Sequence, residues 1–152
     1  MTVLHRCYLQ VTQAVPPTEV FVATDDERIV SECTTHGMQW IMTSERCLTG
    51  TDRVAEVSEQ IPAEWYVNVQ GDEPFLDPRG LTKIVDTALD SGQEVAVVNA
   101  FTPILSDEEF RSPTVPKVVA TPTGKLRYIS RAAIPTEDRK STRLNSSHTD
   151  IS

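Results

Sequence analysis

The sequence has 152 residues, 39% of them hydrophobic, which is enough for one core in a domain of ordinary size. Its 22 acidic and 14 basic residues give a net charge of -8, which argues against a protein that coats nucleic acid or an anionic membrane, since both tasks need a basic surface. Because the sequence has neither a run of roughly 18 apolar residues nor a signal-peptide pattern, we predict a cytoplasmic protein without a membrane span.

The first part of the chain is predicted to form a helix, a strand and a second helix. Apolar residues at three- and four-residue spacing predict a helix over 1–15, which two prolines end. The β-branched run EVFVAT predicts a buried strand over 19–24. Asp25 can then cap a helix whose end Gly37 marks.

The alternation of strands and helices continues along the chain. Short apolar runs predict strands over 39–43 and 65–70, the second being the clearest in the sequence. A helix is expected over 51–60, and another begins at Asp77-Pro78, where an N-cap residue precedes a proline.

The last predicted elements complete an α/β pattern. A strand is expected over 94–101, and Ser106 and Glu109 have the spacing of a capping box for a short helix. The segments 117–120 and 126–130 are expected to pair as a hairpin. Strands regularly separated by helices predict a mostly parallel, doubly wound sheet.

Polar residues directly after predicted strands are the candidates for function, because the ligands of a doubly wound sheet gather at the carboxyl ends of its strands. In the stretch QGDEP, Asp72 follows a strand and Gly71 leaves room for a close approach, so Asp72 could hold a hard cation such as Mg²⁺. The alternative is a turn in which Asp72 or Glu73 caps backbone amides.

Three further residues are candidates with simpler alternatives. Arg53, at the helix start in TGTDR, stands where free amides attract phosphate or carboxylate; alternatively Thr51 is an ordinary N-cap and Arg53 is solvated. Arg131 could bind a substrate carboxylate through its planar guanidinium, or pair with an acidic side chain of the protein. We interpret Asp25 as a helix cap.

Other common kinds of site are not indicated. The three cysteines never occur as Cys-x-x-Cys, which disfavours a disulfide framework and a structural zinc site, so reduced and mostly buried thiols are expected. The histidines are scattered. No nucleophile elbow, Walker loop or Gly-x-Gly-x-x-Gly fingerprint occurs, which disfavours the commonest hydrolase, P-loop and dinucleotide-binding functions.

Five stretches, in this order, resemble the 3-deoxy-manno-octulosonate (Kdo) cytidylyltransferases, or CMP-Kdo synthetases: VATDDERI, TGTDRVAEV, VNVQGDEPFLDP, KVV and SRAAIP. The similarity covers about Leu4 to Pro135, and TGTDR with QGDEP is its most specific part. The resemblance implies a Rossmann-like nucleotidyltransferase fold with a β-hairpin insertion, and a homodimer. It also implies transfer of CMP from CTP to Kdo, with release of pyrophosphate, for lipopolysaccharide synthesis.

The resemblance implies roles for four residues by position. Asp72 and Arg53 would be the catalytic residues, with Asp72 as the Mg²⁺ ligand. Gln70 would lie beside nucleotide and sugar, Arg53 would bind the CTP end and Arg131 the Kdo carboxylate. Lys117 receives no role, because the sequence before it departs from the family pattern.

The chain also departs from the family at both ends. Family members begin with a strand and a Gly- and Arg-containing loop ending in P-G-K, and nothing here corresponds to them. We therefore expect 1–135 to be a partial cytidylyltransferase domain and the Ser/Thr/Asn-rich stretch 136–152 to be a disordered or non-native tail. Two alternatives stay open: a cytidylyltransferase for another acidic sugar, such as 8-amino-Kdo or a nonulosonic acid, and a non-catalytic nucleotide-binding module.

Overall fold

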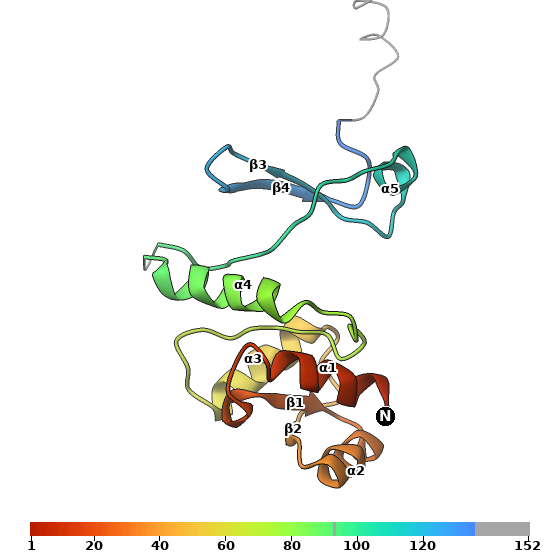
Figure 1. The fold of residues 1–152 in the computed structure, drawn as a ribbon, viewed down its shortest axis with the longest axis vertical. Helices are drawn as coiled ribbons and strands as arrows, with labels where there is room; N and C mark the ends of the chain where they lie inside the picture. The colour runs from red at the N-terminus through yellow and green to blue at the C-terminus, as the bar shows by residue number, and fades with distance from the viewer. Residues whose placement is uncertain (93, 136–152) are drawn as a thin grey trace, which may run out of the picture. The chain divides into compact units, whose positions relative to one another are not determined.

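The structure, a computed structural model, describes residues 1–92 and 94–135. The chain divides into two compact units, Met1–Ala100 and a second that begins at Phe101, and each is described by itself. Figure 1 labels their helices and strands. In the described ranges, none of the helices is both long enough and apolar enough to cross a membrane. The predicted tail 136–152 lies outside the described residues, and the predicted single domain over 1–135 stays a prediction.

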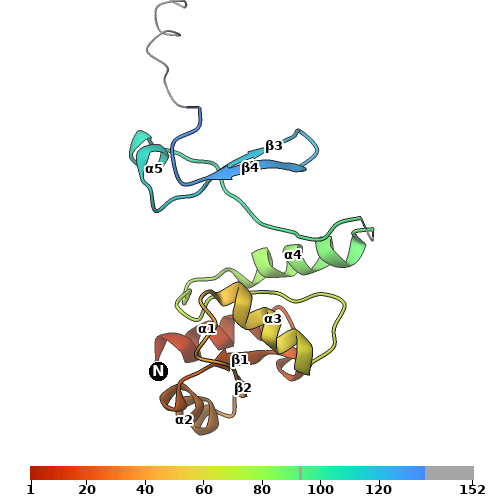
Figure 2. The same cartoon turned by 180° about the vertical axis from the view of Figure 1, so that it is seen from behind.

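The first unit is built on a short parallel sheet with helices around it (Figures 1 and 2). β1 (Phe21–Thr24) pairs in parallel with β2 (Gln39–Met42), and Phe21 stands opposite Gln39. α2 (Glu27–His36) connects the two strands, because parallel neighbours need a crossover between them. This strand-helix-strand arrangement confirms the prediction for the corresponding part of the sequence.

Further helical segments complete the first unit: α1 (Val3–Val11), the 3₁₀ turn η1 (Pro17–Glu19), α3 (Gly50–Gln60) and α4 (Pro78–Asp90). α4 packs against α1, while α3 contacts β1. Asp77 accepts a hydrogen bond from the Arg79 amide and begins α4, and Gly37 ends α2 with a φ of 65°. Both of these predicted helix boundaries are confirmed.

Two predicted helix caps are wrong by one or two residues. Asp26, rather than Asp25, caps α2 by accepting a hydrogen bond from the Arg28 amide. Thr49, rather than Thr51, caps α3, and it forms a reciprocal capping box with Asp52. A threonine followed by an acid three residues later is the pattern that specifies this start, and Thr51 lies two residues too late to fit it.

The capping box predicts a measurable difference between two neighbouring threonines. Thr49→Ala is expected to lower the free energy of unfolding by about 1 kcal/mol, because the Asp52 amide at the start of α3 loses its acceptor. Thr51→Ala is the matched control and should change it by less than about 0.5 kcal/mol. Urea unfolding followed by tryptophan fluorescence measures both, since Trp40 and Trp65 belong to the first unit. Equal losses would contradict the assignment of the cap.

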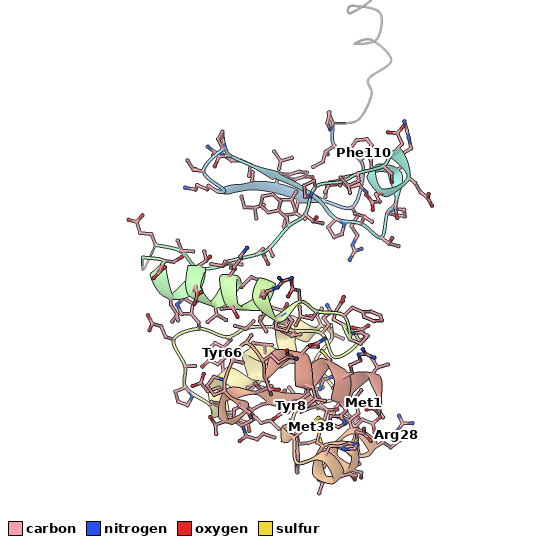
Figure 3. All side chains as sticks on the ribbon, viewed as in Figure 1. Met1, Tyr8, Arg28, Met38, Tyr66 and Phe110 are labelled. Atoms are coloured by element: carbon pink, nitrogen blue, oxygen red, sulfur yellow. The ribbon has the colours of Figure 1, made fainter. Side chains whose placement is uncertain are left out.

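The core of the first unit joins α1 and α2. Tyr8, Cys33 and Met38 are buried together, and four partly buried apolar residues pack against them, namely Leu4, Val20, Val22 and Ile29. Figure 3 shows Tyr8 and Met38 turned into the interior, while Arg28 reaches outward from α2. Cys7 is buried beside this cluster, and the cysteines are free thiols, as predicted.

Two predicted strands, 65–70 and 94–101, are not formed by the described residues. Residues Val67, Asn68 and Val69 make no backbone hydrogen bond with any described residue. A strand exists only as part of a hydrogen-bonded ladder, so an apolar, β-branched run cannot form one without a neighbouring strand. The sequence pattern identified segments that favour the extended conformation, but it does not show whether a neighbouring strand is present to pair with them.

The second unit contains a helix and a hairpin. α5 (Asp107–Arg111) starts at Ser106, whose hydroxyl accepts from the Glu109 amide, as the capping-box spacing predicts. β3 (Lys117–Ala120) and β4 (Leu126–Ser130) are antiparallel, which confirms the predicted hairpin. Gly124 has a φ of 84° in the turn, a conformation that glycine adopts at little cost.

A buried lysine holds this second unit together. Lys117 is only 2% exposed, and its ammonium group donates to the carbonyl oxygens of Val115 at 2.9 Å, Arg131 at 3.0 Å and Ser112. Because the three donors of the ammonium meet three backbone acceptors, the buried charge is solvated by the main chain. Lys117 thereby ties the segment before β3 to the residue after β4.

Candidate active site

A cavity of about 500 Å³ lies within the first unit. The carboxyl end of β1, the first turn of α3 and the segment 67–72 line it. A Cβ atom added at Gly50 would stand 3.6 Å from the side-chain nitrogen Nδ2 of Asn68, so the start of α3 and this segment are in contact. Three of the four residues singled out in the sequence line the cavity: Arg53, Gln70 and Asp72.

Arg53 joins the ends of both strands to α3. Its guanidinium donates to the Asp25 carboxylate at 3.0 Å and to the hydroxyl of Thr43, which is buried. Asp25 directly follows β1 and Thr43 directly follows β2, while Arg53 stands in the first turn of α3. The Arg53 side chain is 20% exposed, so the interpretation of it as a solvated residue is wrong.

The ion pair changes the interpretation of Asp25 as well. The Arg53 guanidinium lowers the pKa of the Asp25 carboxyl below its usual value, with a smaller contribution from the residue's own backbone amide. Asp26, the actual cap of α2, has a pKa of about 2, lowered first by the Arg28 side chain and then by the Arg28 amide. Both carboxylates are therefore more readily ionised in the folded chain than in an unfolded one.

These pKa shifts predict an acid-sensitive contribution to stability. A carboxyl group whose pKa is lowered by folding stabilises the fold at pH values above ~3.9, its pKa in the unfolded chain. The stabilisation is lost as the pH falls through the pKa of the folded state, which is about 2 for Asp26. We expect thermal unfolding of Asp25→Asn to depend less on pH between about 4 and 2 than that of the unaltered chain. Asp90→Asn, at the exposed end of α4, is the control. If the melting temperature of Asp25→Asn changed with pH as steeply as that of the unaltered chain, the result would argue against the ion pair.

The Asp72 side chain takes no part in holding the turn in which it stands. Its carboxylate lines the cavity, is exposed, and makes no hydrogen bond or ion pair with any described residue. The turn is held instead by the main chain, since the Gln70 carbonyl accepts from the Glu73 amide and the Cys7 thiol, each at 3.3 Å. The alternative in which Asp72 or Glu73 caps backbone amides is therefore not formed.

Residues of α1 contact the turn around Gly71. Besides the thiol contact, a Cβ added at Gly71 would come within 3.1 Å of a methyl carbon of Leu4, a tight approach. Burial raises the pKa of the Cys7 thiol; the Glu73 amide opposes this shift, while the carboxylates of Glu73 and Asp72 add to it. Cys7 is thus a neutral structural donor that positions Gln70 and Asp72, a role for which the sequence offered no signal.

The predicted Mg²⁺ can be compared with the carboxylates that the cavity offers. In residues 1–92 and 94–135, no group of three His, Cys, Asp or Glu side chains could enclose a metal ion. Magnesium usually takes one or two protein carboxylates and fills its other positions with phosphate oxygens and water. The carboxylate of Asp72, which has no partner among the described residues, is compatible with an ion of this kind that is shared with a substrate phosphate.

Arg131 belongs to the second unit and is not among the residues that line the cavity of the first. Its guanidinium donates to the carbonyl oxygens of Pro113 at 3.4 Å and Thr114 at 3.3 Å. The predicted alternative, a pair with an acidic side chain, is not formed among the described residues. Backbone carbonyls hold the guanidinium without neutralising its charge, which leaves it suited to an anion.

Comparison with known proteins places the chain in a family. A family model described as cytidylyltransferase matches residues 1–151. The chain belongs to the cytidylyltransferase family. Its sequence is 39% identical over 145 residues to the 3-deoxy-manno-octulosonate cytidylyltransferase of Protochlamydia amoebophila, and 40% identical over 134 residues to that of Syntrophotalea carbinolica.

These alignments use most of this cytidylyltransferase chain, 92% and 88%, but only 55% and 53% of the relatives. The chain thus spans about half the length of the curated relatives that it matches. A solved structure of CMP:2-keto-3-deoxy-manno-octonic acid synthetase in complex with CTP has a TM-score of 0.77 and 30% identity, covering 91% of this chain and 57% of that one. The likeness confirms the predicted α/β nucleotidyltransferase fold.

Proposed function

We propose that this cytidylyltransferase transfers CMP from CTP to Kdo and releases pyrophosphate. The observation that supports this most directly is the cavity that Arg53, Gln70 and Asp72 share, in a chain whose relatives carry the name of that activity. In the reaction, the anomeric hydroxyl of the sugar attacks the α-phosphorus of CTP. The new oxygen–phosphorus bond replaces the bond to the leaving pyrophosphate, and the proton of the hydroxyl passes to water.

Arg53 is assigned to the CTP end. Its guanidinium uses one donor on Asp25 and one on Thr43, which leaves three of its five N–H groups for phosphate oxygens. The ion pair also orients the guanidinium before any ligand arrives, so little side-chain entropy remains to be lost on binding. Gly50, at the first turn of α3, adds backbone amides that attract an anion.

Asp72 is assigned to the metal and Gln70 to the nucleotide and sugar. When bound, Mg²⁺ would offset the negative charge of the phosphate groups. Asp72 would hold the ion beside the cavity, and the Gln70 amide can donate to and accept from hydroxyl groups. Arg131 is assigned to the Kdo carboxylate, because a guanidinium binds a carboxylate with two parallel hydrogen bonds.

The complete enzyme is proposed to act as a homodimer in the cytoplasm, where its product would serve lipopolysaccharide synthesis. The substrates are anionic while the chain carries a net charge of -8, so binding depends on the local cations Arg53 and Arg131 and on Mg²⁺. A nucleic-acid partner is not proposed, because it would need a basic surface of large extent.

The activity can be tested in a chimera in which this chain replaces the matching segment of the Protochlamydia amoebophila relative. We expect pyrophosphate release from CTP only when both Kdo and Mg²⁺ are present. Equal or faster turnover with 8-amino-Kdo or a nonulosonic acid would assign the chain to another acidic sugar. Binding of CTP without turnover in a folded chimera would instead indicate a non-catalytic nucleotide-binding module.

A further inference from the structure

Glu56 is a charged side chain of α3 that the proposed reaction does not use. It is half-buried, and it is not among the residues that line the cavity. It stands three residues after Arg53, and residues at this spacing are neighbours on the surface of a helix. Among the described residues, its carboxylate accepts hydrogen bonds from Ser44 and Cys47 and forms no ion pair. Glu56 and Arg53 thus both reach from α3 to the residues that follow β2.

The Glu56 carboxylate holds two donors at once. The Ser44 amide donates to both of its oxygens, at 2.9 and 3.0 Å, and the Cys47 thiol donates to one of them at 3.1 Å. The hydrogen bond with Glu56 raises the pKa of the Cys47 thiol, and burial adds to this shift, so the thiol stays protonated and can donate. Hydrogen bonds to an ionised acceptor are stronger than those between neutral groups.

The segment 44–48 depends on this carboxylate for its position. Its other hydrogen bonds are local: the Arg46 amide donates to the Ser44 hydroxyl at 3.1 Å and the Cys47 amide to the Ser44 carbonyl at 3.3 Å. In the described part of the chain, each hydrogen bond that ties 44–48 to another segment ends on Glu56. A surface segment with so few outside contacts opens readily when they are removed.

Thr43 connects this segment to Arg53. It is 5% exposed, its amide donates to the Thr24 carbonyl at 2.8 Å, and its hydroxyl accepts from the Arg53 guanidinium. The sheet therefore fixes Thr43 on its amino side, and the Ser44 amide, bound to Glu56, fixes it on its carboxyl side. A guanidinium held at one nitrogen alone can pivot about that contact, so the second anchor at Thr43 decides its orientation.

We propose that Glu56 is a positioning residue for the transfer reaction: it holds the segment after β2 in place, so that Thr43 orients the Arg53 guanidinium toward the triphosphate. The inference rests on the proposed function, which assigns Arg53 to the CTP end. Because Glu56 acts through Arg53 and touches no substrate, its loss should weaken the binding of CTP and leave the binding of the sugar unchanged.

Nuclear magnetic resonance of the Arg53 side chain tests the positioning without any nucleotide. In the labelled 152-residue chain, its two terminal nitrogens should give separate signals, because Thr43 and Asp25 bind different nitrogens and slow their exchange by rotation. Glu56→Ala should merge the two signals. Glu59→Ala is the control and should keep them separate, because Glu59 is an exposed carboxylate of the same helix without a described partner. The signals are assigned by their loss in Arg53→Lys.

Steady-state kinetics of the chimera test the consequence for the reaction. Glu56→Ala should raise the KM for CTP by about 10-fold, the effect of one weakened charged hydrogen bond, and change the KM for Kdo by less than about 2-fold. A variant that only lowers the amount of folded enzyme would instead reduce kcat and keep both KM values. An inactive chimera, together with Arg53 signals that merge in Glu56→Ala, would count against the transfer reaction and still support the positioning of Arg53.

A second substitution covers the case in which Glu56→Ala does not fold. Glu56→Gln keeps the shape of the side chain but replaces one acceptor oxygen with a donor, so it should raise the KM for CTP by about 3-fold.

Three results would overturn the proposal. Separate and unchanged Arg53 signals in Glu56→Ala, or in Glu56→Gln if only that variant folds, would show that the sheet alone holds Thr43. A lower KM for CTP in Glu56→Gln would show that the charge of Glu56 acts on the nucleotide directly. An equal rise of this KM in Glu59→Ala would indicate a general effect of charge on α3.

Discussion

Asp72→Asn is expected to lower kcat/KM of the chimera by roughly 100-fold or more, because it removes the carboxylate that would hold Mg²⁺ against the triphosphate. The stability of the folded state should stay nearly unchanged. The Asp72 side chain makes no hydrogen bond or ion pair with the described residues, so the free energy of unfolding should change by less than about 0.5 kcal/mol. Steady-state pyrophosphate release and urea unfolding measure the two quantities separately.

The matched control for this variant is Asp90→Asn, an exposed carboxylate at the end of α4 that does not line the cavity. It removes the same charge from the same unit, so a general electrostatic effect would appear in both variants. Undiminished turnover in Asp72→Asn, or an equal loss in Asp90→Asn, would contradict the assignment of Asp72 as the metal ligand.

Lys117→Ala is expected to destabilise the hairpin of the second unit by about 2 kcal/mol. The change leaves the carbonyls of Ser112, Val115 and Arg131 without their shared donor and opens a void at a side chain that is 2% exposed. Amide exchange in β3 and β4 is the suitable measurement, because it reports local opening and both tryptophans belong to the first unit.

Lys125→Ala provides the control for the lysine prediction. Lys125 is exposed at the hairpin turn, and its side chain has no hydrogen bond with the described residues. Exchange rates in β3 and β4 should stay unchanged in this variant and rise about 30-fold in Lys117→Ala, the equivalent of 2 kcal/mol. Similar rates in the two variants would mean that the carbonyl contacts of Lys117 add little stability.

Local rules in the sequence predicted the elements whose information is itself local. The boundaries at Gly37 and Asp77, the capping-box spacing of Ser106 and the hairpin around Gly124 all depend on residues within one turn of each other. The cap at Thr49 was also encoded locally, but Thr51 lies in the same motif and competes for the same interpretation. Choosing the wrong threonine as the cap shifts the predicted start of the helix by two residues, but the helix itself is still predicted correctly.

Features that depend on distant contacts could not be predicted in this way. The ion pair of Arg53 with Asp25 joins residues 28 positions apart, and the Cys7 thiol reaches a carbonyl 63 positions away. The strand predicted over 65–70 is missing from the ladder for the same reason, since pairing depends on a neighbour that the segment itself does not encode. Three of the four candidate residues, Arg53, Gln70 and Asp72, nevertheless line one cavity, because polar residues that follow the strands of such folds gather at one edge of the sheet.

The most direct test of the proposed site is paramagnetic broadening of amide resonances by Mn²⁺, which takes the same oxygen ligands as Mg²⁺. In the isotopically labelled chain with CTP, we expect Mn²⁺ to broaden the amides of Gly71, Asp72 and Glu73 and those at the start of α3, and to leave them sharp in Asp72→Asn. Broadening confined to other segments, or equal broadening in both proteins, would contradict a nucleotide–metal site in this cavity.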